Sequence, residues 1–345
     1  MRPAGKESVT MTAGPRKPAL DAAEFEALYL RLRQVPGWGQ ADRRGALNHL
    51  TPERVRAASA EIRLGRTVSL AAPIETALTP DDPAPAIHEM SGPPGTGANP
   101  RGLTFAQDRL GINVHSNVDS HIDALCHAMY RKTLYNGVPA AAVTSQGAQE
   151  LSIEVARDGI AGRGVLLDIP RLRGVPWLEP GDLVTAAELA AAAETQQVSV
   201  GPGDLLFVRT GHRRRRREVG PWDAAKARAG LHPAALEFIA EREVAVLGSD
   251  SNSDVAPSLA EGVDLPVHVL AINTLGVHLL DYLQFENLVP LCEAAGRWSF
   301  FCVIAPLRLP HGTGSPINPV AIMLAGCCPG IFPRSLAPSA KDGGQ

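Results

Sequence analysis

Three of the chain's ten histidines, His115, His121 and His127, lie within thirteen residues of one another, together with Asp123. Neutral imidazole and carboxylate are the groups with which proteins bind zinc, manganese or iron. In an extended strand, residues i and i+2 point to the same face, so a strand over residues 121–123 would aim His121 and Asp123 at one ion. His115 has the same parity and would join them in a regular strand. The stretch therefore predicts a metal site.

A buried strand with hydrogen-bonded histidines is the alternative interpretation, and for any single histidine it would be the better one. The clustering of three histidines with a carboxylate favours the metal site. His127 follows Leu125 and Cys126, where we expect the chain to turn into a helix.

Length and composition are ordinary for a globular protein: 345 residues, 45% hydrophobic and 20% charged, in one large domain or two. A net charge of −3 gives no reason to expect nucleic acid or an anionic membrane as partner. The five cysteines form no CxxC pair and indicate reduced thiols of a cytoplasmic protein. No apolar run approaches the roughly 18 residues that span a membrane. Residues 1–18, which lack a signal peptide's apolar core, and residues 336–345 are expected to be disordered, flanking one domain over 19–335.

Periodicity and turn residues predict a mixed α+β or α/β sheet. Helices are expected over 19–33 and 232–243. A third helix is expected to begin after Thr51 as N-cap and to end before Gly65, and a fourth to begin at the capping box of Thr185 and Glu188. Short apolar runs predict buried strands over 164–169, 205–209, 244–248, 298–305 and 320–325. The Pro/Gly-rich stretch 79–101 is expected to be a long surface loop, and the five arginines 213–217 a solvated loop.

The segment Ser120 to His127, Ser-His-Ile-Asp-Ala-Leu-Cys-His, resembles the second half of a family signature, His-x-Gly-Thr-His-x-Asp-Ala-x-x-His. The family comprises the cyclase-type metal-dependent hydrolases, including bacterial kynurenine formamidase and isatin hydrolase. In the first half this chain has Asn117 four residues before His121, whereas His115 stands six before. Some longer members carry His-x5-His here, so the resemblance favours His115 as the ligand, with Asn117 as the alternative.

Two distant segments extend the resemblance. The run beginning at Trp38 is similar to "WGxxDxxGALNxLTPE" of longer members, and residues 305–319 are similar to the C-terminal "PLxxxxGTGSPxNP". In the latter, Gly312 and Gly314 are expected to allow close backbone packing near the site, with Ser315 capping it. Whether His311 reaches substrate, and whether Asp250 serves the site or a turn, stays open on the sequence.

A third matching segment implies the rest of the site. Leu265-Pro-Val-His268, followed by Gly276-Val-His278-Leu-Leu-Asp281, resembles the family's Pro-x-His and later glutamate, which implies His268 and Asp281 as ligands of a second ion bridged by Asp123. The spacing is one residue longer and the carboxylate one methylene shorter here, so His278 is a possible substitute for Asp281. His127 matches the general acid/base.

The resemblance implies a swivelling β/β/α domain with an N-terminal helical extension, holding one or two divalent ions of zinc or manganese. It implies a hydrolase of C–N bonds in small cyclic or aryl amides, formamides or lactams. A cyclase or dehydratase of a polyketide-like pathway, using the metal as Lewis acid, is the alternative, and a non-catalytic small-molecule-binding protein is a third. Homodimers or larger homo-oligomers are expected by the same resemblance.

Overall fold

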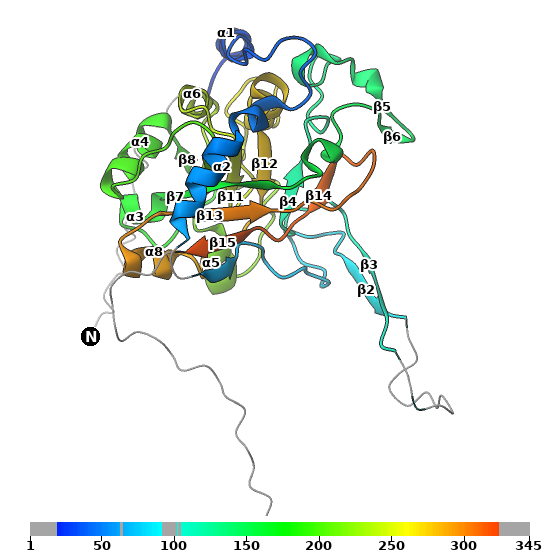
Figure 1. The fold of residues 1–345 in the computed structure, drawn as a ribbon, viewed down its shortest axis with the longest axis vertical. Helices are drawn as coiled ribbons and strands as arrows, with labels where there is room; N and C mark the ends of the chain where they lie inside the picture. Colours follow the sequence, from blue (N-terminus) through cyan, green and yellow to red (C-terminus); the bar gives the residue numbers. More distant parts are fainter. Residues whose placement is uncertain (1–18, 63–64, 92–101, 103–104, 324–345) are drawn as a thin grey trace, which may run out of the picture.

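The computed structural model describes residues 19–62, 65–91, 102 and 105–323; the predicted disordered segments 1–18 and 336–345 lie outside this part. A nine-stranded sheet forms the centre (Figure 1). Its strands run in the order β1 (Arg66–Ser69), β15 (Val320–Met323), β13 (Ser299–Ile304), β7 (Ile160–Asp168), β9 (Leu205–Arg209), β11 (Val246–Ser249), β12 (His278–Asp281), β4 (His121–Asp123) and β14 (Gly314–Pro316). The predicted mixed α/β architecture is confirmed.

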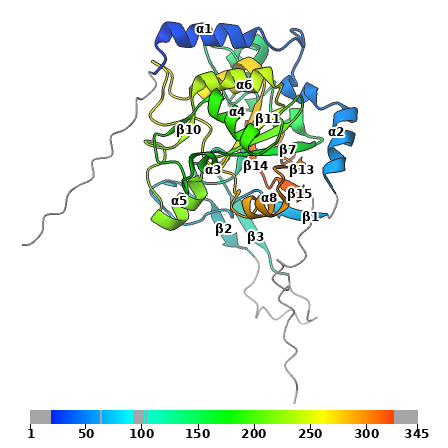
Figure 2. The same cartoon turned by 90° about the vertical axis from the view of Figure 1, so that its left-hand side faces the viewer.

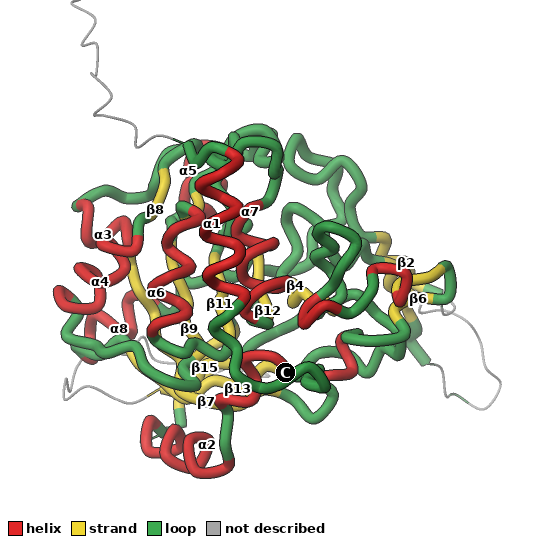
Figure 3. The backbone as a smooth tube through the Cα atoms, turned by 90° about the horizontal axis from the view of Figure 1, so that it is seen from above, coloured by secondary structure: helices red, strands yellow, loops and turns green. Residues whose placement is uncertain are grey.

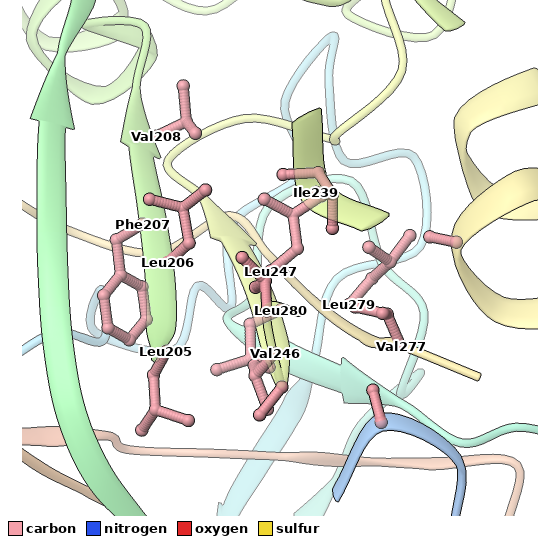
Figure 4. Close-up of a cluster of buried hydrophobic side chains, with 14 of the residues drawn as sticks. Leu205, Leu206, Phe207, Val208, Ile239, Val246, Leu247, Val277, Leu279 and Leu280 are labelled. Atoms are coloured by element: carbon pink, nitrogen blue, oxygen red, sulfur yellow. The ribbon is translucent and has the colours of Figure 1, made fainter. Parts of the chain in front are cut away.

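The middle of the sheet is parallel, from β7 through β9 and β11 to β12, and antiparallel strands flank it on both sides. Parallel strands are covered on both faces and read as continuous apolar runs, as Leu205 to Val208 do here. Figure 4 shows their side chains packed with those of β11 and β12 and with Ile239 of a covering helix. The predicted strands correspond to β7, β9, β11, β13 and β15, with ends shifted by up to four residues; residues 324 and 325 of the last one lie outside the described part of the chain.

Helices α3 (Ile169–Arg173), α4 (Ala186–Thr195) and α6 (Leu236–Glu241) cover this core (Figures 2 and 3). The capping box of Thr185 and Glu188 opens α4 as predicted. Short helix α7 (Pro266–His268) continues into a π-helical segment, Val269–Leu275, on which the N-terminal helix α1 (Ala22–Arg33) packs. Tyr29 of α1 donates a hydrogen bond to Asn273 at 3.0 Å. The N-terminal helical extension is therefore part of the fold.

Helix α2 (Pro52–Ala58) begins at the predicted cap, where Thr51 accepts from the backbone N–H of Arg54. It ends in a 3-10 turn at Glu61, short of the predicted stop near Gly65. The remaining elements are small. They include helix α8 (Val289–Ala295) and the strand pairs β2 (Ile87–Met90) with β3 (Asp108–Gly111), β5 (Val143–Thr144) with β6 (Gly147–Ala148), and β8 (Leu183–Val184) with β10 (Gly230–Leu231).

One predicted loop is wrong in part and another is wrong; residues 92–101 of the first lie outside the described part of the chain. Part of 79–101 forms β2, which pairs with β3 in an exposed hairpin that projects from the body (Figure 1), because the pairing comes from residues 108–111 beyond the stretch. The arginine run forms helix α5 (His212–Val219). Its charges are compensated across the fold: Arg216 pairs with Glu75 and Asp81, and buried Arg213 donates to backbone carbonyls of Val118, Tyr282 and Leu283.

No helix in the described part of the chain combines the length and apolar character needed to cross a bilayer.

Candidate metal centre

Strand β4 lies between β12 and β14, so three distant parts of the chain meet at its three residues. His121 is paired with Asp281 on one side and Pro316 on the other, and Asp123 with Gly314. As the strand periodicity predicts, His121 and Asp123 share a face, with Nε2 of the first 3.7 Å from Oδ1 of the second. The other ring nitrogen of His121 is hydrogen-bonded to the carbonyl of Asp119 at 2.8 Å, which leaves Nε2 turned toward the carboxylate.

His115 is not in this strand, so the regular strand that would have brought it to the site by parity is absent. Ser116 Oγ accepts the backbone N–H groups of Val118 and Asp119, which bends the chain into a turn before β4. The imidazole of His115 nevertheless reaches the same carboxylate, with Nδ1 2.8 Å from Asp123 Oδ1. Its Nε2 lies 3.0 Å from the hydroxyl of Thr313.

His268 approaches from the opposite side, from the short helix α7. Its Nε2 is 3.3 Å from Asp123 Oδ2 and 3.4 Å from Asp281 Oδ2. Its Nδ1 is held at 2.6 Å by Asp254, whose carboxylate also accepts the backbone N–H groups of Val267 and His268. An imidazole whose far nitrogen donates to a carboxylate presents the other as a metal-facing lone pair.

His127 lies in a turn closed by its N–H and the carbonyl of Ala124, and not in the predicted helix. Its ring stacks on that of His115 with centroids 3.8 Å apart, and its Nε2 is 4.0 Å from Asp123 Oδ1. The side chains of His127 and His115 are 28% and 26% exposed, whereas that of His121 is 4% exposed. These two rings are therefore the solvent-facing side of the cluster.

In the described residues, two groups have ligand atoms close enough together to share an ion: His115, His121 and Asp123, and Asp123, His127 and His268. Both include Asp123. The second group differs from the predicted one: it contains His127, which was predicted as the general acid/base, and it does not contain Asp281. The carboxylate of Asp281 accepts from Asn252 and from the backbone and hydroxyl of Ser253.

Of the two substitutes considered from the sequence, His278 is in neither group, and the position of Asn117 is known from its contact. Asn117 is near Tyr282, whose hydroxyl is 3.4 Å from its side-chain oxygen. His278 is fully buried, and neither of its ring nitrogens has a hydrogen-bond partner in the described structure.

The electrostatics of the cluster suit a cation. Burial by itself raises the pKa of Asp123, but His127, His115, His268 and His121 hold it well below its usual value. Burial lowers the pKa of His268, yet its bonds to Asp123, Asp254 and Asp281 hold it well above the usual value. The buried carboxylates are therefore stabilised by positive charge in the cluster. Asp123 Oδ2 also lacks a well-formed hydrogen bond. The donor set and its charge fit a divalent metal ion.

Sequence reasoning missed Asp254 and Thr313. Asp254 ends the run Gly-Ser-Asp-Ser-Asn-Ser-Asp, in which Asp250 was the residue considered. Asp250 instead accepts from the backbone and hydroxyl of Thr210 and from Gly211, so it serves the turn after β9. His311 binds the carbonyl of Ala148 through Nδ1. The Gly-Thr-Gly motif was a usable signal for Thr313, since its glycines predicted close packing.

That close packing is present. A Cβ on Gly314 would lie 2.5 Å from the carbonyl oxygen of Ile122 and 2.8 Å from Cε1 of His115. Ser315 is buried and accepts the backbone N–H of Leu307, so its hydroxyl stabilises the turn leading into β14.

Comparison with known proteins places this arrangement in a family. A family model described as "Putative cyclase" matches residues 40–253. A crystal structure described as a novel cyclase is similar over 83% of this chain and 97% of its own, with 34% identity and a TM-score of 0.74. Two structures of isatin hydrolase A share the fold. The one from Labrenzia aggregata has 21% identity and a TM-score of 0.55, and the match covers 77% of this chain and 95% of its own. The one from Ralstonia solanacearum has 20% identity and a TM-score of 0.55, and the match covers 79% of this chain and 98% of its own. No curated protein matches. The chain belongs to the cyclase family.

Proposed function

We propose that this protein is a metal-dependent hydrolase that cleaves a C–N bond in a small cyclic or aryl amide, formamide or lactam. The observation that carries the proposal is the buried carboxylate of Asp123 with nitrogen atoms of His115, His121 and His268 within 3.7 Å of its oxygens. The shared fold with isatin hydrolases, whose substrate is a cyclic amide, supports the reaction class.

His115, His121 and Asp123 would hold one zinc or manganese ion, and His268 with Asp281 would complete a second site that shares Asp123. A divalent cation supplies a Lewis acid that polarises a carbonyl oxygen and lowers the pKa of water toward 7. Ligand atoms of His115, His121 and Asp123 lie close enough together to share an ion, and so do those of Asp123, His127 and His268, so one ion or two would fit the residue types present.

His127 is suited to moving the proton. Burial, opposed by Asp123 and reinforced by the neighbouring histidines, lowers its pKa to about 4, so its imidazole is neutral at pH 7 and can accept. Its partial exposure gives water and substrate access to the ring. It would take a proton from water and return it to the leaving nitrogen.

A cyclase or dehydratase is the second candidate, favoured by the similar structure described as a novel cyclase. In that case the same residues would polarise a carbonyl group without consuming water. The two functions differ in whether turnover incorporates water, which oxygen-18 labelling of the product measures.

Elemental analysis of the purified protein, followed by amide and lactam panels, tests the proposal. We expect one or two zinc or manganese ions per chain, loss of the metal in His121→Ala, and retained metal with lost turnover in His127→Gln. Unchanged metal content in His121→Ala would remove the proposed ligands. Full activity in His127→Gln would remove this residue from proton transfer and leave it as a ligand at most. Absence of metal even after reconstitution would leave only the hypothesis of a non-catalytic small-molecule-binding protein.

A further inference from the structure

The ring of His115 is held in place although neither a helix nor a strand carries it. Its contacts include Asp123 at Nδ1, Thr313 at Nε2, the stacked ring of His127 and the edge of the His121 ring. Thr313 is 198 residues away in the sequence and follows the turn before β14. Since the ring is partly exposed and sits in a turn, its orientation depends on these contacts rather than on backbone packing.

The two partners of the ring have different chemistry. The carboxylate of Asp123 can only accept a hydrogen bond, so without a cation the ring's proton belongs on Nδ1 and Nε2 accepts from the hydroxyl of Thr313. When a cation takes the Nδ1 lone pair, the proton belongs on Nε2, and the same hydroxyl accepts it. A hydroxyl can rotate to serve both states, whereas the carboxylate of Asp254 allows His268 only one tautomer.

The backbone keeps the two partners of the ring at a fixed separation. The N–H of Ala124, next to Asp123, donates to the carbonyl of Thr313 at 3.0 Å, and Gly314 pairs with Asp123 in the sheet. The absence of a side chain on Gly314 lets the ring of His115 pass over this strand. Asp123 and Thr313 therefore form a rigid clamp on the two nitrogens.

We propose that Thr313 is a positioning residue whose hydroxyl holds the His115 imidazole with Nδ1 toward Asp123, as acceptor or donor according to whether a cation is bound. The proposal rests on the proposed function only in taking His115 as a metal ligand. The ring keeps one proton throughout, which moves from Nδ1 to Nε2 when the cation binds. The site would thus combine a ligand of fixed tautomer, His268, with one whose tautomer changes.

Two variants separate the hydroxyl from the shape of the side chain. Thr313→Val keeps the β-branched volume and the backbone bond to Ala124, and Thr313→Ser keeps the hydroxyl. We expect Zn²⁺, titrated against a chelator, to bind the valine variant about 10- to 100-fold more weakly than wild type, the usual effect of losing such a partner. The serine variant should bind like wild type. A valine variant with wild-type affinity would overturn the proposal.

Nitrogen-15 NMR of labelled histidine provides a readout that needs no activity. Metal-free wild type should show His115 protonated on Nδ1, and Zn²⁺ should move the proton to Nε2. The valine variant should show mixed tautomers, with the resonance assigned by His115→Gln. A proton already on Nε2 in metal-free wild type would refute the proposal even if the valine variant failed to fold. If wild type binds no Zn²⁺, the proposed function fails, but the metal-free tautomers still decide the role of Thr313.

Discussion

Replacing Asp254 with asparagine keeps the shape of this side chain but removes its charge and one acceptor oxygen. In the native structure Oδ1 accepts the N–H of Val267, and Oδ2 accepts both the N–H and the ring Nδ1 of His268. An asparagine has one acceptor oxygen, so its NH2 group meets a backbone N–H whichever way the amide faces. At least one buried donor is then unsatisfied.

The size of the effect follows from these contacts. An unsatisfied buried donor costs about 1–3 kcal/mol of folding free energy. With the amide oxygen toward His268, a neutral acceptor replaces the carboxylate and the ring becomes a weaker ligand. With the amide nitrogen toward it, the tautomer that presents Nε2 to the metal is lost. Changing such a partner typically lowers metal affinity 10- to 100-fold, or about 1.4–2.7 kcal/mol.

The measurement is a pair of titrations on the same preparations. Urea unfolding of the metal-free protein gives the loss of folding free energy, and chelator competition gives the metal affinity of the folded protein. Asp264→Asn is the matched control, because Asp264 is exposed and lies ten residues along the same segment. The reasoning is refuted if Asp254→Asn binds zinc as tightly as Asp264→Asn does.

Three further substitutions test other parts of the site. Gly314→Ala should lower stability by about 1–3 kcal/mol and weaken metal binding, since its Cβ meets backbone and the His115 ring, whereas Gly201→Ala, with nothing within 4 Å, should change neither. His278→Leu should stabilise the protein by removing a buried imidazole without partners. Burial lowers the pKa of His278 to about 4, so as pH falls from 6.5 to 4 urea unfolding should show wild type losing up to about 3 kcal/mol more than the variant; an equal loss in both would contradict it. His115→Ala should lose metal while Asn117→Ala retains it, and the reverse pattern by elemental analysis would make Asn117 the ligand.

Much of the local structure could be predicted from the sequence because its signals are local. The alternation of side chains in a strand is sufficient to place His121 and Asp123 on one face. The capping residues Thr51 and Thr185 mark helix starts because their hydroxyls reach N–H groups three residues on. The resemblance to the family predicted His268 as a metal ligand, whereas its apolar neighbours alone would have predicted a core residue.

Tertiary structure decided the contacts between distant parts of the chain. The arginines 213–217 form a helix because carboxylates and carbonyls from other segments compensate them, which no local pattern reveals. A turn brings His115 to the site, where the hydroxyl of Thr313 contacts its ring. The carboxylate of Asp254 orients the ring of His268. The sequence by itself thus determined which residue types could bind a metal and the face they share. Which atom of each ring faces the carboxylate depended on hydrogen-bond partners that only folding brings within about 3 Å.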